Sequence, residues 1–169
     1  FALAVVHPRA GNIGGGGFMV IRMANGEAAA LDYREKAPAA ASRDMYLDSL
    51  GNVLQNLRKE GHLSVGVPGS VAGLEAAFKK YSKLKDWKLL LEPAIQLAEN
   101  GFLLTQAEAD RLNKYREDFI KNNLDASPFV KNGGWKMGDR LLQPALANTL
   151  RLIQQKGAAG FYEGVTADK

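Results

Sequence analysis

The chain of 169 residues carries a formal net charge of +4, with 46% hydrophobic and 24% charged residues. This is an ordinary globular composition, so extensive disorder is excluded and the charge gives no reason to expect nucleic-acid binding. The absence of cysteine excludes disulfides, zinc–thiolate sites and cysteine nucleophiles. Every apolar run is shorter than the roughly 20 residues that a spanning helix needs, so we expect no membrane span.

The first half of the chain favours strands and loops. Residues 1–8 are small and apolar, which fits either the tail of a buried helix or a short strand. Two apolar runs flank Asn25-Gly26, so a β-hairpin is predicted over residues 17–34. Residues 36–44 fit a short helix or a loop, and residues 47–63 fit mostly loop.

The second half favours helices. Apolar residues spaced by three and four predict a helix over residues 71–81, with Ser70 as its N-cap. A second helix is expected over residues 87–100, ended by Gly101, with Pro93 opening its main part. Thr105 has Glu108 at capping-box spacing, which predicts a third helix to about residue 121.

A turn at residues 132–134 and a fourth helix over residues 144–156, ended by Gly157, complete the pattern. A hairpin followed by helices predicts an α+β chain or a layered α/β sandwich.

Four glycines at positions 14–17 form the first candidate site. They precede a strand and match neither dinucleotide nor P-loop spacing. Close backbone packing, with turns through positive φ, is therefore favoured over phosphate binding.

Arg34 follows an apolar run and is the second candidate. A guanidinium at a strand end can offer a carboxylate a planar fork of donors. The structural alternative is an ion pair with Asp32 or Glu35.

The other polar candidates favour structural roles. Ser70 is not in a G-x-S-x-G motif, so helix capping with glycines for close packing is favoured over a nucleophile. A basic cluster is expected to be a solvated face, and His7 and His62 are isolated. No histidine spacing indicates a metal site. The basic cluster comprises Lys79, Lys80, Lys83, Lys85 and Lys88.

Seven blocks, in order along nearly the whole chain, resemble the bacterial γ-glutamyltransferase (γ-glutamyltranspeptidase) family. The blocks are residues 1–8, 11–19, 31–38, 66–73, 92–102, 138–143 and 160–164. The resemblance implies a precursor that cleaves itself into a large and a small subunit, whose new N-terminal threonine is the nucleophile. It also implies the N-terminal-nucleophile hydrolase αββα sandwich and no metal or organic cofactor. Residues 1–169 would then be part of the large subunit of one such domain, with no internal boundary.

By this resemblance Arg34 corresponds to the arginine that binds the α-carboxylate of the γ-glutamyl group. The three threonines, Thr105, Thr149 and Thr166, lie outside a Thr-Thr-His-like motif. We therefore expect no catalytic residue in this chain and a small subunit as its partner.

Glutathione and related γ-glutamyl compounds are the expected substrates, in the periplasm or outside the cell. The alternatives are a cephalosporin or glutaryl acylase or a poly-γ-glutamate-processing enzyme of the same superfamily, and, from another class, a non-catalytic binding module. The first and last residues of the chain suggest that it is part of a longer polypeptide. A slice through a sandwich exposes sheet edges and an apolar face, so self-association is expected for residues 1–169 alone.

Overall fold

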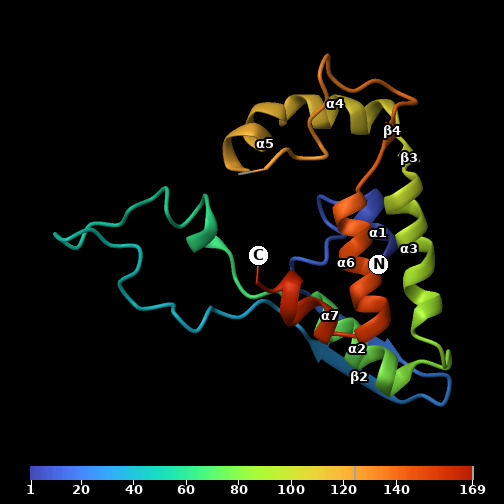
Figure 1. The fold of residues 1–169 in the computed structure, drawn as a ribbon. Coiled ribbons are helices and arrows are strands. Elements are labelled where there is room, and N and C mark those ends of the chain that lie inside the picture. The colour runs from blue at the N-terminus through green and yellow to red at the C-terminus, as the bar shows by residue number, and fades with distance from the viewer. Residues whose placement is uncertain (124, 169) are drawn as a thin grey trace. The chain divides into compact units, whose positions relative to one another are not determined.

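The computed structural model describes residues 1–123 and 125–168. Helices and two small antiparallel sheets, β1–β2 and β3–β4, make up the predicted α+β chain (Figure 1). None of the described helices combines the length and apolar character that crossing a membrane would require. In chain order the elements are α1 (Ala2–Val6), β1 (Phe18–Arg22), β2 (Ala28–Asp32), η1 (His62–Ser64), α2 (Ser70–Tyr81), α3 (Lys88–Asn100), β3 (Phe102–Leu103), α4 (Gln106–Lys114), α5 (Arg116–Asn122), β4 (Arg140–Leu141), α6 (Pro144–Lys156), α7 (Ala159–Tyr162) and η2 (Gly164–Thr166).

The chain divides into two compact units. One unit joins Phe1–Ile13 to Leu74–Lys169, and the other is Gly14–Gly73. The predicted absence of a domain boundary concerns the whole large subunit, so it stays a prediction.

The first unit has a helical core. Helix α3 packs against α1 and α6, and α6 also packs against α7; α3 and α6 run side by side in Figure 1. Apolar residues at helical spacing make the contact face, and small alanines among them let the two helices approach closely. The buried residues of these two helices are Leu91, Ala94, Ile95, Ala98, Ala147, Leu150 and Ile153.

One buried polar residue links three parts of this core through its side chain and its backbone. Gln143 is 3% exposed. Its Nε2 donates to the carbonyl of Val5 at 2.9 Å, and its backbone N–H donates to the carbonyl of Ala98 at 2.8 Å. A buried amide is tolerated here because its hydrogen bonds are satisfied.

The second unit begins with the predicted hairpin, which the structure confirms. Strands β1 and β2 pair antiparallel from Phe18↔Asp32 to Arg22↔Ala28, and Gly26 takes a φ of 91° in the turn. Residues 36–67 are mostly turns, with antiparallel bridges Lys36↔Val67 and Leu47↔Val53. The loop interpretation of this segment is therefore confirmed.

The local end signals of three helices are confirmed, and the structure also decides between helix and strand for residues 1–8. Residues 2–6 form a helix, so the helix alternative for residues 1–8 is correct and the strand alternative is wrong. Gly101 (φ 73°) and Gly157 (φ 64°) end α3 and α6. Thr105 and Glu108 form the reciprocal capping box of α4.

Three helix predictions are wrong in detail. Pro93 lies inside α3 and does not open its main part. It is on the exposed side of the helix, where water can donate to the carbonyl that lacks the missing proline N–H. The third helix breaks at Tyr115 (φ −99°, ψ 13°) into α4 and α5. Ser70 is the first residue of α2 and not its N-cap, because the Gly69 carbonyl already accepts the Gly73 N–H at 2.9 Å.

Glu75 should make the stability of the complete protein depend on pH. The Glu75 side chain is 20% exposed, and burial alone would raise the pKa of its carboxyl. Hydrogen bonds from Lys79 (2.9 Å) and from the Ala158 N–H (3.1 Å) instead lower this pKa below its usual value. A lowered folded-state pKa contributes stability above the unfolded pKa, and this is lost as the pH falls through the folded pKa. We expect Glu75→Gln to cost about 1 kcal/mol at pH 7.

The measurement is the free energy of unfolding of Glu75→Gln and the unsubstituted protein across acidic to neutral pH. The two curves should converge at low pH. Glu27→Gln, in the exposed hairpin turn, is the control and should change little. A constant gap between the Glu75→Gln and unsubstituted curves at every pH would contradict the ionic origin of the effect.

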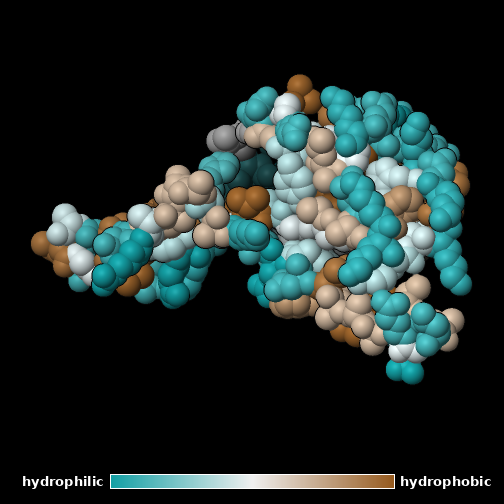
Figure 2. Space-filling model, turned by 90° about the horizontal axis from the view of Figure 1, so that it is seen from below, coloured by the Kyte–Doolittle hydropathy of each residue, from teal (hydrophilic) through white to brown (hydrophobic). Residues whose placement is uncertain are grey.

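The outward face of the hairpin should promote self-association of residues 1–169 alone. Phe18 and Val20 on this face are 64% and 83% exposed, and Figure 2 shows hydrophobic residues exposed among hydrophilic ones. Such surface promotes association between copies of a chain. Light scattering should detect oligomers of the isolated chain, and Val20→Lys should reduce them. A monodisperse monomer would contradict this expectation.

Candidate functional site

Arg34 lies two residues beyond β2, where the chain leaves the hairpin. Its backbone N–H donates to Asp32 Oδ1 at 3.0 Å, and its Nε donates to Glu35 Oε2 at 3.1 Å. The guanidinium carbon lies 5.8 Å from the centroid of the Phe18 ring. Both acidic neighbours named from the sequence are therefore partners, one through the backbone and one through the side chain.

The end of the guanidinium group is available to a ligand. The Arg34 side chain is 61% exposed, and in the described part of the chain its two terminal nitrogens make no hydrogen bond. A guanidinium whose Nε is occupied still offers the planar pair of terminal nitrogens. This edge matches the two oxygens of a carboxylate.

Glu35 keeps the opposite edge of Arg34 occupied. Its own backbone N–H, the Arg34 guanidinium and the Gly16 N–H all lower the pKa of the Glu35 carboxyl below its usual value. The carboxylate is therefore ionised at neutral pH. It can hold Nε in place while the terminal nitrogens face solvent.

Some glycines of this unit provide the close packing predicted for residues 14–17 and 66–74. A Cβ built on Gly16 would lie 2.6 Å from the carbonyl oxygen of Tyr33, and one on Gly73 would lie 2.7 Å from Cδ1 of the Tyr33 ring. The expected positive φ is wrong for residues 14–17, because none of them has one. Gly16 and Gly73 are therefore required for space and not for an unusual backbone angle.

The remaining candidates have structural surroundings. Ser70 is 8% exposed and its N–H donates to the Gly15 carbonyl at 2.9 Å, so it belongs to the packing of α2. The five lysines of the basic cluster, His7 and His62 are all exposed. Thr105 caps α4, and the hydroxyls of Thr149 and Thr166 donate to the backbone carbonyls of Ala145 and Gly160. Within residues 1–123 and 125–168, no group of three or more potential metal-binding side chains occurs.

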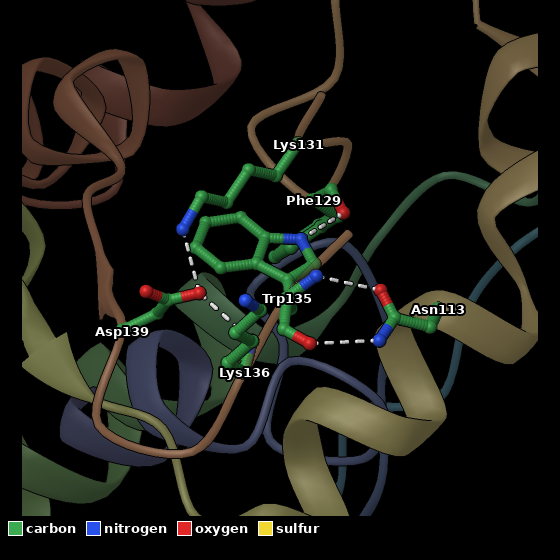
Figure 3. A network of polar contacts seen from close by, with 6 residues as sticks. All are labelled: Asn113, Phe129, Lys131, Trp135, Lys136 and Asp139. Carbon is green, nitrogen blue, oxygen red and sulfur yellow. Dashed lines mark hydrogen bonds and ion pairs between the residues drawn. The ribbon is translucent and has the colours of Figure 1, made fainter. Parts of the chain in front are cut away.

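A polar network in the helical unit was not anticipated from the sequence. Asn113 on α4 pairs with the backbone of Trp135, donating to its carbonyl at 2.8 Å and accepting from its N–H at 2.7 Å (Figure 3). The Trp135 indole donates to the Phe129 carbonyl at 2.7 Å, and Lys131 pairs with Asp139 at 2.6 Å. These contacts hold the loop after α5 against α4.

The loop and α4 border a cavity of about 320 Å³. Its lining is mainly apolar, and Glu108 in the lining is already engaged in the capping box. Among the described residues that line the cavity, none is a nucleophile hydrogen-bonded to a base. The lining residues are Val6, His7, Pro8, Arg9, Phe102, Leu104, Glu108, Arg111, Leu112, Tyr115, Phe119, Phe129 and Leu141.

Comparison with known proteins decides the family. The model of the gamma-glutamyltranspeptidase family matches residues 1–169, the whole chain. The chain belongs to the γ-glutamyltranspeptidase family. The resemblance seen in the seven sequence blocks is thereby confirmed.

Relatives of this γ-glutamyltranspeptidase-family chain agree in sequence and in fold. It is 50% identical, over its full length, to the glutathione hydrolase proenzyme of Pseudomonas sp. strain A14, of which it covers 30%. The crystal structure of Helicobacter pylori γ-glutamyltranspeptidase matches 99% of the chain with a TM-score of 0.89 and 49% identity, and the chain covers 48% of that structure's chain.

A more distant likeness bears on the predicted alternatives. The cephalosporin acylase of Bacillus halodurans matches 99% of the chain, with a TM-score of 0.79 and 23% identity, and 32% of the acylase chain is covered. At this identity the likeness shows a shared fold alone. The fold is the one expected from the resemblance, an N-terminal-nucleophile hydrolase fold of which this chain is a part.

Proposed function

We propose that this chain is the N-terminal part of the large subunit of a γ-glutamyltransferase. The complete protein would transfer or hydrolyse the γ-glutamyl group of glutathione and related γ-glutamyl compounds. The proposal depends mainly on the 50% identity, along the whole chain, with a protein named glutathione hydrolase proenzyme. We also propose that the two compact units belong to one domain, completed by the polypeptide that the relatives possess beyond this segment.

In this proposal Arg34 binds the α-carboxylate of the γ-glutamyl group. Its terminal nitrogens would donate hydrogen bonds to the two carboxylate oxygens while Glu35 holds Nε. A fork–fork pair fixes direction as well as charge, so the γ-carbonyl would point to a defined place. A substrate that lacks the α-carboxylate should therefore bind poorly.

The covalent chemistry would take place on the small subunit, formed by self-cleavage of a precursor. The hydroxyl of its N-terminal threonine would attack the γ-carbonyl, and the bond to the leaving amine would break. Water or an acceptor amine would then cleave the γ-glutamyl ester. Dividing one difficult acyl transfer into two steps is what a covalent nucleophile achieves. We place the enzyme in the periplasm or outside the cell, as for bacterial members of the family.

The experiment is a comparison of substrates with the complete protein. Glutathione, a glutaryl-cephalosporin and poly-γ-glutamate would be supplied separately, and mass spectrometry would establish whether the protein consists of two cleaved chains. We expect two chains and preferred turnover of glutathione. An uncleaved protein without γ-glutamyl turnover would refute the proposal and favour a binding module, whereas preference for either other substrate would favour an acylase or a capsule-processing enzyme.

A further inference from the structure

Three segments of the second unit meet at the backbone of Arg34. The Gly15 carbonyl accepts the N–H groups of both Gly69 and Ser70 at 2.9 Å, which joins the glycine run to the start of α2. Gly17 and Tyr33 exchange two backbone hydrogen bonds, of 3.3 and 2.9 Å, which extend the hairpin ladder toward Arg34. The peptide that leads into Arg34 is therefore bordered by both segments.

Two glycines approach this peptide too closely for any side chain. A Cβ on Gly16 would lie 2.6 Å from the Tyr33 carbonyl oxygen and 2.9 Å from the Arg34 Cα. A Cβ on Gly69 would lie 2.8 Å from the Tyr33 carbonyl carbon and 3.0 Å from the Arg34 carbonyl oxygen. Every one of these contacts is with backbone, which cannot rotate away as a side chain can.

We propose that Gly16 and Gly69 are positioning residues, which clamp the Tyr33–Arg34 backbone and thereby fix the point from which Arg34 reaches the substrate carboxylate. This inference rests on the proposed function of Arg34. A methyl group on either glycine would push the Arg34 Cα outward. A displacement of about 1 Å at a substrate-orienting group can cost about 100-fold in rate.

Gly17, next to Gly16 in the chain, supplies a matched control. A Cβ on Gly17 would meet the edge of the Tyr33 ring, at 3.2 Å from Cε2 and 3.3 Å from the hydroxyl oxygen. A ring edge can give way by a few tenths of an ångström through side-chain rotation. Neither Gly16 nor Gly17 has a positive φ, so alanine is compatible with the backbone angles at both positions. The two alanine variants therefore differ in the atoms that the added methyl group contacts, which are backbone atoms for Gly16 and ring atoms for Gly17.

The test uses the complete, processed protein with γ-glutamyl-p-nitroanilide and with its analogue in which the α-carboxylate is a carboxamide. The measured quantity is the ratio of kcat/KM for the two substrates. Gly16→Ala and Gly69→Ala should each lower this preference for the carboxylate about 10-fold or more, mainly through KM. Gly17→Ala should change it less than about two-fold. A merely structural defect would reduce the turnover of both substrates equally and leave the ratio unchanged.

The outcomes separate this inference from the function on which it rests. If Arg34→Ala abolishes the carboxylate preference while Gly16→Ala and Gly69→Ala retain it, the clamp is refuted and the role of Arg34 stands. If Arg34→Ala itself retains the preference, the role of Arg34 fails. If neither glycine variant yields processed protein while Gly17→Ala does, the two glycines have a folding role and the positioning assignment is also refuted.

Discussion

Arg34→Ala should raise KM for a γ-glutamyl substrate about 100-fold in the complete protein, corresponding to a loss of about 3 kcal/mol. The reason is that a carboxylate which loses its two-donor partner keeps the cost of desolvation without the compensating pair. The effect should fall mainly on KM, because the α-carboxylate is held in both the ground state and the transition state. Steady-state kinetics with a γ-glutamyl substrate measure it directly.

Arg34→Lys separates charge from geometry. Lysine keeps the positive charge but lacks the planar fork, so it should restore little of the lost affinity. Arg22→Ala is the matched control, since Arg22 is another exposed arginine at the end of a strand of the same hairpin. An unchanged KM in Arg34→Ala, or full rescue by lysine, would remove the assignment of this site.

Leu91→Ala should destabilise the helical unit by about 3 kcal/mol. Leu91 is completely buried on α3, so its truncation loses transfer free energy and leaves a cavity between packed helices. Leu89, on the same helix, is 58% exposed. Leu89→Ala should therefore cost less than about 1 kcal/mol.

Chemical denaturation of the complete protein, followed by helical circular dichroism, would compare the two leucine variants. The midpoint should shift clearly for Leu91→Ala and little for Leu89→Ala. Equal shifts would show that the exposed side of α3 is covered in the complete protein, or that the core described for α3 and α6 is incorrect.

Short-range signals explain what could be predicted of the fold. The end of α3 at Gly101, the end of α6 at Gly157 and the capping box of Thr105 with Glu108 each depend on contacts within a few residues. The hairpin turn at Asn25-Gly26 is of the same kind. Such features depend on local backbone chemistry, which a single sequence displays directly.

Long-range contacts explain what could not be predicted. Strands β3 and β4 have two residues each, too few to show a period, and they pair across the α4–α5 segment. The break of the third helix at Tyr115 coincides with the pairing of Asn113 with the distant Trp135 backbone. No pattern within α4 indicates this partner.

The candidate site was predicted in part. Arg34 forms hydrogen bonds with two residues close to it in sequence, Asp32 and Glu35. Because these partners are local, both could be named from the sequence. The glycines around Ser70 indicated close packing, but nothing in the sequence identified Tyr33 as the surface against which Gly69 and Gly73 pack. The role of Arg34 in binding a substrate carboxylate remains a proposal, supported by family membership and by the exposure of its side chain.

The backbone of Arg34 is fixed more firmly than its side chain. In the described part of the chain, one hydrogen bond to Glu35 and the nearby Phe18 ring restrain the guanidinium group, which is otherwise exposed. An arginine side chain carries about 2 kcal/mol of rotamer entropy, part of which is surrendered when a ligand holds it. Capture of a carboxylate here should therefore be driven by enthalpy and opposed by entropy, and binding should weaken as the temperature rises.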